Sequence, residues 1–193
     1  MDNQESQFVD KCIVHFSQHF ICQRERWSKC RNGRIDIVLS TANGEHFGIE
    51  AKVPDKKRGE GLGEYVKQAI RYTGYEFEVS PNHFQKIPIF ICPAISYKYF
   101  LLNEREMVFE GEKWHKDRHK ETDTHHSMNG FLGAFLIGEV RNVGGKDFTL
   151  MLSNKIIYDT RLGWDEVDGK WVKNKKIGLI QKNYDALIQK ISK

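Results

Sequence analysis

The amino-acid sequence predicts an α/β domain built on a mixed β-sheet. Some segments place apolar residues every three or four positions, which is typical of helices with one buried face. Other segments alternate apolar and polar residues, as half-buried strands do. The run "KIPIFICP" is almost entirely apolar, which favours a central strand. The 193 residues suit one domain with its own core.

The first half of the chain predicts the order helix, strand, strand, helix, strand. Phe8, Cys12 and Phe16 share one face of the first helix, and Tyr65 and Ala69 share one face of the second. The basic stretch "CQRERWSKCRNGR" is interpreted as a connection. We expect these elements at residues 4–21, 35–40, 46–53, 62–77 and within 86–93.

The second half predicts further strands and a final helix. The segments "FLGAFLIGEVR", "KDFTLML" and "KIIYDTR" favour strands, and Asp168-Gly169 favours a hairpin turn in "WDEVDGKWV". Residues 176–193 have the period of a basic amphipathic helix. We therefore expect a single domain over residues 1–193. Its core would occupy about 5–100, and C-terminal additions would occupy about 101–193.

Composition and charge bound the class of protein. Hydrophobic residues make up 39% and charged residues 29%, which is typical of a soluble globular domain. No apolar run approaches the ~20 residues that span a bilayer, so we expect no membrane partner. The polar start "MDNQESQF" is not a secretory signal. The four cysteines lack CxxC spacing, which favours reduced thiols and a cytoplasmic location; a viral or mobile-element origin stays open.

Charged residues interrupt the two strands in "GRIDIVLSTANGEHFGIEAKVPD". Side chains alternate along a strand, so Asp36 lies on the face opposite its apolar neighbours, and Glu50 and Lys52 share a face. Charges in such positions cost stability unless they are paired, solvated or used. The hairpin therefore raises the question of what these three side chains do together.

The loop between the strands decides whether Asp36 and Glu50 share a face. A two-residue Asn-Gly loop would pair Asp36 with Ala51 and separate the acids. A three-residue loop ending at Gly44 would pair Asp36 with Glu50 and use Gly44 as its left-handed residue. Local turn chemistry allows both loops. The two acids favour the three-residue loop, because adjacent carboxylates can bind one divalent cation.

Two adjacent carboxylates and a lysine can hydrolyse a phosphodiester. Oxygens of Asp36 and Glu50 would bind Mg²⁺ or Mn²⁺, which polarises the phosphate and lowers the pKa of a bound water. Lys52 would orient that water or stabilise charge on the phosphate. The alternative is a surface hairpin whose polar face meets solvent.

Asp36, the turn and Glu50-Ala51-Lys52 together resemble the motif of the PD-(D/E)XK nuclease superfamily, which includes restriction endonucleases, Holliday-junction resolvases and recombination exonucleases. Here Ile35 stands where the motif has proline. The resemblance implies a restriction-endonuclease-like core followed by additional strands and a final helix. It also implies the Ala51 carbonyl as a further metal ligand.

An acid from the first helix is implied as a supporting ligand of the metal. Glu5 is favoured for this position, and Asp10 is its competitor. Gln68 and Tyr72 form a Q-x-x-x-Y pattern similar to that of the exonuclease- and resolvase-like branch. Positions i and i+4 lie on one helix face, so we expect both side chains at the rim of the site. A core position for Tyr72 is the alternative.

The resemblance implies a Mg²⁺- or Mn²⁺-dependent deoxyribonuclease, with endonuclease favoured over exonuclease. DNA, duplex or branched, would be the partner, and a homodimer stays open. A nucleic-acid-binding module that keeps the fold without cleaving is the alternative function. The net charge of +4 permits such a partner. The residues expected to contact nucleic acid are Arg34, Lys56, Lys57, Arg58 and Arg71.

Two further groups of residues have no firm assignment. Four histidines between His115 and His126 lie in a polar stretch, which is interpreted as a loop rather than a zinc site. Trp27, Trp164 and Trp171 could stack on bases, as could Trp114, but packing in the core or in hairpins is favoured for each.

Overall fold

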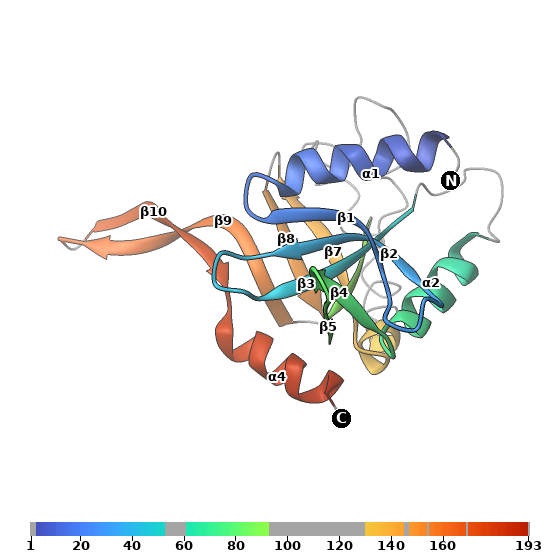
Figure 1. Ribbon diagram of the computed structural model, residues 1–193. Helices are drawn as coiled ribbons and strands as arrows, with labels where there is room; N and C mark the ends of the chain where they lie inside the picture. Colours follow the sequence, from blue (N-terminus) through green and yellow to red (C-terminus); the bar gives the residue numbers. More distant parts are fainter. Residues whose placement is uncertain are drawn as a thin grey trace.

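The computed structural model describes residues 3–52, 61–92, 130–144, 147–153, 155–168 and 170–192. Within these ranges the chain folds around one large mixed sheet, which confirms the predicted α/β class (Figure 1). The elements are α1 (Asn3–Phe16), β1 (Ile21–Trp27), β2 (Arg34–Ser40), β3 (His46–Ala51), α2 (Gly61–Tyr72), β4 (Glu76–Ser80), β5 (His83–Lys86), β6 (Ile89–Cys92), β7 (Ile137–Gly144), β8 (Asp147–Leu152), β9 (Lys155–Val167), β10 (Lys170–Leu179) and α4 (Gln181–Ile191).

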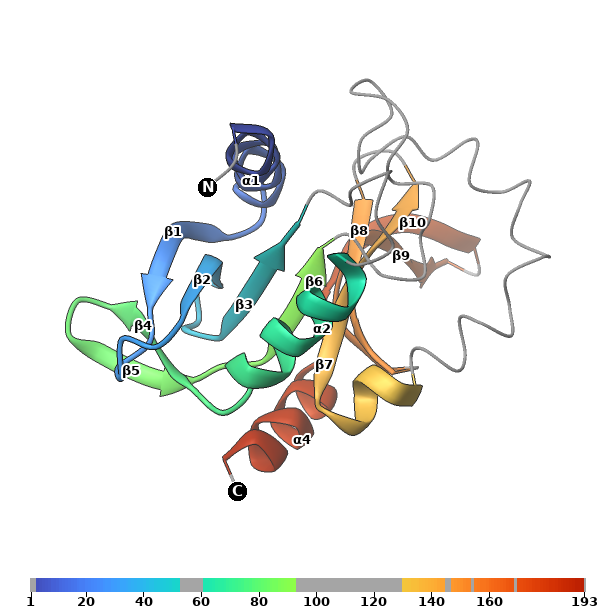
Figure 2. The ribbon, with the colours of Figure 1, turned by 90° about the vertical axis from the view of Figure 1, so that its right-hand side faces the viewer.

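The large sheet has the strand order β1-β2-β3-β6-β7-β8-β9-β10. Strands β1, β2 and β3 are antiparallel, whereas β3, β6 and β7 run parallel. Parallel neighbours need a crossover connection, and α2 lies in the connection from β3 to β6. Figure 2 shows α2 in front of β6, with which it is in contact. The central position expected for the run at Ile89–Cys92 is confirmed.

The two faces of the sheet carry separate cores. One core combines apolar residues of the sheet with those of α1 and α4, such as Phe16 and Leu187. The other combines Val38, Ile91 and their neighbours with Tyr65, Ala69 and the rest of the apolar face of α2. None of the helices in the described ranges is long and apolar enough to cross a membrane.

The four cysteines carry free thiols, as predicted. Cys12 and Cys92 are both buried in the core beneath α1, with their sulfur atoms 3.9 Å apart. They act there as small apolar side chains, because a buried thiol is only a weak hydrogen-bond donor.

Residues 22–27 of the basic stretch belong to strand β1, so their interpretation as a connection was wrong, whereas residues 28–33 do form the turn to β2. β1 pairs with β2 in antiparallel register from Ile21 opposite Ser40 to Trp27 opposite Arg34. Its polar residues gave no apolar alternation to recognise. Partners from other elements accommodate them instead: Arg24 pairs with Asp10 of α1.

The second helix ends at Tyr72 rather than at residue 77. Thr73 and Gly74 form a turn, and Phe77 lies in β4 of a small hairpin that the sequence did not predict. Phe77 stays in the core beneath α2, as its apolar side chain requires, but it reaches the core from a strand. Apolar spacing alone did not separate the two possibilities.

The C-terminal strands extend the same sheet. β7 pairs in parallel with β6, and β8, β9 and β10 follow in antiparallel order. Val167 pairs with Lys170, so β9 and β10 form the hairpin predicted for this segment. The segment predicted as one strand begins with a short helical turn at 130–134 before β7. Helix α4 begins only at Gln181, because the preceding residues pair with β9 as part of β10.

Candidate metal centre

The hairpin of β2 and β3 has the three-residue loop that the acids favoured. Leu39 pairs with Phe47 and Ser40 with His46, and the Thr41 N–H donates to the Glu45 carbonyl at 2.9 Å. Gly44 adopts a φ of +90°, which only glycine adopts without strain. This register places Asp36 opposite Glu50 and confirms the predicted pairing.

The backbone ladder opens beside Asp36. Backbone pairing between β2 and β3 ends at Ile37 and Ile49. Beyond this pair, the Ala51 N–H donates to the side chain of Asp36, at 2.8 Å from Oδ2, rather than to a backbone carbonyl of β2. On the other side, Glu25 of β1 has a φ of 51° and is left out of the pairing with β2. The carboxylate therefore takes the place of a backbone acceptor at the point where the strands separate.

Asp36 is a carboxyl group held in a largely dry environment. Its residue is 9% exposed, and burial raises the pKa of Asp36 to about 6. The hydrogen bond from the Ala51 N–H opposes this shift, whereas the negative charge of Glu5 adds to it. Positive charge from Lys52 and Arg34 lowers the pKa again. Asp36 thus lies within the electrostatic reach of three of the predicted site residues.

Glu50 is the acid of the group whose ionisation the surroundings oppose most strongly. It is 2% exposed, and burial raises its pKa to about 9, with the negative charge of Asp36 adding to the shift. Its Oε2 is buried without a hydrogen-bond partner. A buried polar atom in this state costs about 1–3 kcal/mol. The free protein therefore holds Glu50 at the expense of its own stability.

Lys52 and Glu5 meet at the same end of the sheet. Lys52 Nζ lies 3.6 Å from Glu5 Oε1, and the Lys52 N–H donates to the Cys92 carbonyl at 3.0 Å. Glu5 is thus the acid of α1 that lies beside the site, whereas Asp10 is occupied by Arg24. In this arrangement Glu5 orients the lysine.

The donor set fits a hard divalent cation. In the described part of the chain, no three His, Cys, Asp or Glu side chains gather as a preassembled metal site. Asp36 and Glu50 nevertheless supply two adjacent carboxyl groups, of which Glu50 Oε2 has no hydrogen-bond partner, and the Ala51 carbonyl is the third oxygen that the motif implies. A cation would supply the missing partner of Glu50 Oε2, and Mg²⁺ and Mn²⁺ favour such oxygen ligands.

Tyr72 lies in the core rather than at the rim of the site. It is 4% exposed, and its ring packs edge-on against Phe77 with centroids 5.4 Å apart. Its hydroxyl donates to the Arg34 carbonyl at 2.9 Å and accepts from Gln68 Nε2 at 2.8 Å. The ring also lies so close to Gly33 that a Cβ there would come within 2.8 Å. Tyr72 therefore positions the start of β2, two residues before Asp36.

Tyr65 supports Glu50 in a way that sequence reasoning missed. Its buried hydroxyl donates to the Glu50 carbonyl at 2.9 Å, so α2 fixes the backbone of the residue that carries the unpaired carboxylate. The sequence placed Tyr65 on the apolar side of the helix. The indication available was its type, because a buried tyrosine hydroxyl needs a partner.

The residues expected to contact nucleic acid fall into two groups. Arg34 is ion-paired with Glu25 at 3.1 Å, and Arg71 is exposed on α2 within electrostatic reach of Glu50. Lys56, Lys57 and Arg58 lie outside the described residues, as does the histidine stretch from His115 to His126.

No family model, curated protein or solved structure matches this chain.

Proposed function

We propose that this protein is a metal-dependent nuclease that hydrolyses phosphodiester bonds in DNA. The observation that carries the proposal is the buried pair Asp36 and Glu50, with one carboxylate oxygen unsatisfied, beside Lys52. Buried acids with strongly shifted pKa values and no structural partner are typical of functional sites. A solvent-facing hairpin, the alternative from sequence, does not explain why these acids are buried.

Asp36, Glu50 and the Ala51 carbonyl would hold Mg²⁺ or Mn²⁺. Such an ion, when bound, polarises a phosphate and lowers the pKa of a bound water. The protein contributes the fixed positions of the oxygens: the Ala51 N–H holds the Asp36 carboxylate, and Tyr65 holds the Glu50 backbone. Tyr72 holds the start of β2.

Lys52 would assist the attack of water on the phosphorus. Its ammonium group, oriented by Glu5, can hold the attacking water or stabilise the negative charge that grows on the phosphate oxygens. The attacking oxygen forms a bond to phosphorus while the bond to the leaving sugar oxygen breaks. The attacking water gives a proton to solvent, and the leaving oxygen takes one up from solvent to become a sugar hydroxyl. Because the lysine acts on charge that develops in the transition state, its loss should reduce the rate more than binding.

The arrangement of elements supports the family resemblance. The order α1, β1, β2, β3, α2, β4, β5 and β6 contains the predicted helix, strand, strand, helix, strand, with β1 added before the motif strands and the β4–β5 hairpin added before β6. β3 and β6 are parallel neighbours, and α2 lies between them in sequence. The proposed core is therefore restriction-endonuclease-like, with β7 to β10 and α4 added to it.

The proposal is tested by incubating the purified protein with DNA of several forms. Supercoiled plasmid, linear duplex, single-stranded and branched DNA are each assayed with Mg²⁺, with Mn²⁺ and with a chelator. We expect cleavage with either metal, nicking or linearisation of the plasmid as an endonuclease produces, and no cleavage with the chelator.

Two variants show whether the cleavage belongs to this site. Lys52→Ala should lose most cleavage while DNA binding is kept, and Lys182→Ala on the exposed face of α4 should cut at the parent rate. Equal rates for parent and Lys52→Ala would remove the proposed site. Binding of DNA without cleavage under every condition would favour the non-cleaving module.

A further inference from the structure

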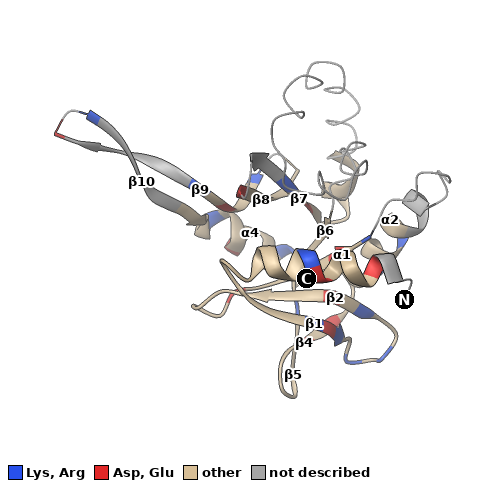
Figure 3. Cartoon of the chain, turned by 90° about the horizontal axis from the view of Figure 1, so that it is seen from above, with Lys and Arg blue, Asp and Glu red and all other residues tan. Residues whose placement is uncertain are grey.

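The turn between β1 and β2 presents a tryptophan flanked by two arginines. Trp27 is 41% exposed, although neighbouring aromatic residues such as Phe77 are buried. The guanidinium carbons of Arg31 and Arg34 lie 6.0 and 5.6 Å from the centroid of its ring. Both guanidinium groups therefore lie over the ring within about the 6 Å limit of a cation–π contact, and 41% of the residue stays open to a ligand. Figure 3 shows basic residues on this turn.

The turn is held in place by its own hydrogen bonds and by β4. The Ser28 N–H donates to the Gly33 carbonyl at 2.8 Å, and the Gly33 N–H donates to Ser28 Oγ at 3.1 Å. The Lys29 N–H donates to the Glu76 carbonyl at 2.8 Å. Arg31 keeps a φ of 60°, a conformation that costs about 1 kcal/mol or more outside glycine. The tryptophan and its arginines are thus preorganised before any ligand binds.

Charge is available on this surface for a ligand. Arg34 is ion-paired with Glu25, but Arg31 forms no ion pair within the described residues. An exposed indole beside an unpaired guanidinium offers a stacking surface and a phosphate contact together. Nucleic-acid strands bind to this combination, because every base has a face that stacks and every linkage carries negative charge.

The surface also adjoins the candidate metal centre. Trp27 pairs with Arg34 across the strands, and Asp36 follows two residues later on β2. At the usual rise of a strand, the Cα atoms of Arg34 and Asp36 are about 7 Å apart. A DNA strand with one phosphate at Asp36 and Glu50 would therefore have a neighbouring nucleotide within reach of Trp27.

We propose that Trp27, Arg31 and Arg34 form a subsite that stacks an unpaired base of the DNA substrate and contacts the adjoining phosphate. The subsite rests on the proposed nuclease function and narrows its substrate. Bases inside a duplex have no free face to stack on an indole. The subsite therefore assigns the substrate to DNA with a single-stranded segment, such as a branch or a frayed end.

Binding in the presence of a chelator tests the subsite without any cleavage. A fluorescently labelled oligothymidylate and a blunt duplex are titrated with the parent and with Trp27→Leu. Stacking of one base is worth about 1–3 kcal/mol, so Trp27→Leu should bind the oligothymidylate roughly 5- to 150-fold more weakly. Duplex affinity should change much less, and Trp27→Tyr should restore part of the loss. Phe131→Leu, at an exposed aromatic residue of the 130–134 turn, is the matched control and should bind as the parent does.

The phosphate contact is tested through the salt dependence of binding. One contact contributes about 0.7 to the slope of log affinity against log salt for single strands, so Arg31→Gln should lower the slope by this amount. Lys182→Gln, an exposed lysine on α4, should leave the slope unchanged. If Trp27→Leu binds the oligothymidylate as tightly as the parent does, with an unchanged melting temperature, the stacking role is overturned. An unchanged slope in Arg31→Gln would overturn the phosphate contact.

The two proposals fail in different ways. A parent that binds the oligothymidylate through Trp27 but never cuts DNA would keep the subsite and remove the nuclease function. A parent that cuts DNA while Trp27→Leu binds as well as it does would remove the subsite alone.

Discussion

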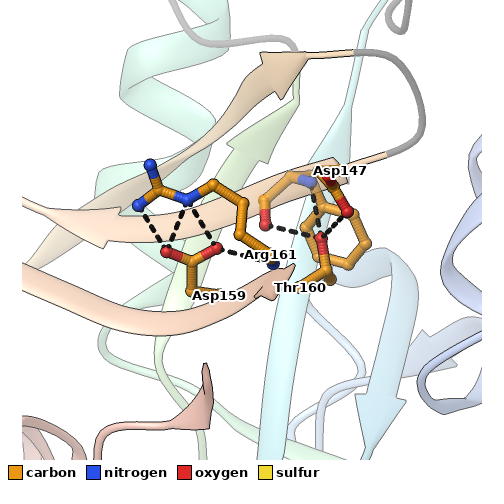
Figure 4. A network of polar contacts seen from close by, with 5 residues as sticks. Asp147, Asp159, Thr160 and Arg161 are labelled. Carbon is orange, nitrogen blue, oxygen red and sulfur yellow. Dashed lines mark hydrogen bonds and ion pairs between the residues drawn. The ribbon is translucent and has the colours of Figure 1, made fainter. Parts of the chain in front are cut away.

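Two buried acids at different places in the sheet show opposite kinds of environment. Asp159 of β9 is fully buried, and Arg161 satisfies both of its oxygens: the Arg161 N–H and Nε donate to Oδ1 at 2.9 and 3.0 Å, and Nε also donates to Oδ2 at 2.9 Å (Figure 4). Glu50 of β3 is almost as buried, but its Oε2 has no hydrogen-bond partner.

The surroundings of Asp159 explain a structural role. At the next residue, the Thr160 hydroxyl accepts from the Phe148 N–H at 2.8 Å and donates to the Phe148 carbonyl at 3.1 Å. Side-chain bonds thus replace backbone pairing where β9 leaves β8, and the ribbon of β9 and β10 extends beyond this point (Figure 1). The Asp159–Arg161 pair and Thr160 anchor the root of that ribbon.

Structural and functional acids differ in whether the chain itself satisfies a buried carboxylate. A buried carboxylate that its own chain satisfies can be explained by the fold alone. A buried carboxylate that its chain leaves unsatisfied costs stability, so its retention needs another explanation. We expect substitutions at Asp159 to change stability and substitutions at Glu50 to change activity.

Among variants of the two buried acids, Glu50→Gln should change the protein most, through a loss of cleavage. Without the charge, the site cannot hold its cation, and cleavage should fall by a hundredfold or more, the order found when groups that stabilise a transition state are removed. The melting temperature of the metal-free protein should change little, because Glu50 with its pKa raised to about 9 is already uncharged at neutral pH and the amide has nearly the same shape. A large drop in melting temperature would place Glu50 in the same class as Asp159.

The second effect is the loss of stability in Asp159→Ala. The variant loses four hydrogen bonds to Arg161. Chemical denaturation should therefore show a free energy of unfolding about 2–3 kcal/mol lower than that of the parent. This loss is small for a broken buried ion pair, because Arg161 is partly exposed. Asp185→Ala, an exposed acid on α4, should change stability by less than about 0.5 kcal/mol. Cleavage per folded molecule should be unchanged in both variants.

The third effect is a pH dependence of stability in protein freed of metal. The folded state raises the pKa of Glu50 to about 9, whereas the unfolded chain has the ordinary value near 4.5. The folded protein therefore holds a proton that the unfolded chain releases, so this stabilisation is complete below pH 4.5 and is lost as the pH rises toward 9. The unfolding free energy should fall by up to about 1.4 kcal/mol per pH unit inside this window.

Two comparisons identify the group behind this slope. Glu50→Gln should flatten the profile, and Mg²⁺ added at pH 8 should raise the melting temperature of the parent but not of the variant. A parent whose stability is independent of pH from 5 to 8 would contradict the unsatisfied state of Glu50.

The smallest effect is expected for Tyr72→Phe. The variant leaves the Arg34 carbonyl without its hydroxyl donor, which should lower the unfolding free energy by about 1 kcal/mol. Cleavage should slow by less than tenfold, because the hydroxyl bonds to backbone and to Gln68. A hundredfold loss of rate at unchanged stability would return Tyr72 to the rim of the site.

Features that depend only on neighbouring residues could be predicted from the sequence. The helical period of α1 placed its apolar face, and the apolar run at Ile89–Cys92 identified a central strand. Gly44 and the spacing of the acids were sufficient to give the hairpin register, and with it the pairing of Asp36 and Glu50. Alternation, period and turn geometry act within a few residues, so they can be read from the chain directly.

Features whose partner lies far away in the sequence became visible only in the folded structure. β1 has no apolar alternation and exists because β2 and α1 accommodate its polar residues. Tyr72 bonds to Arg34 across 38 positions, so its identity alone could not separate a core residue from one at the rim. Burial of Glu50 likewise depends on α2 covering that face of the sheet. Periodicity shows which residues share a face, but only packing shows what covers that face and whether a charge on it finds a partner.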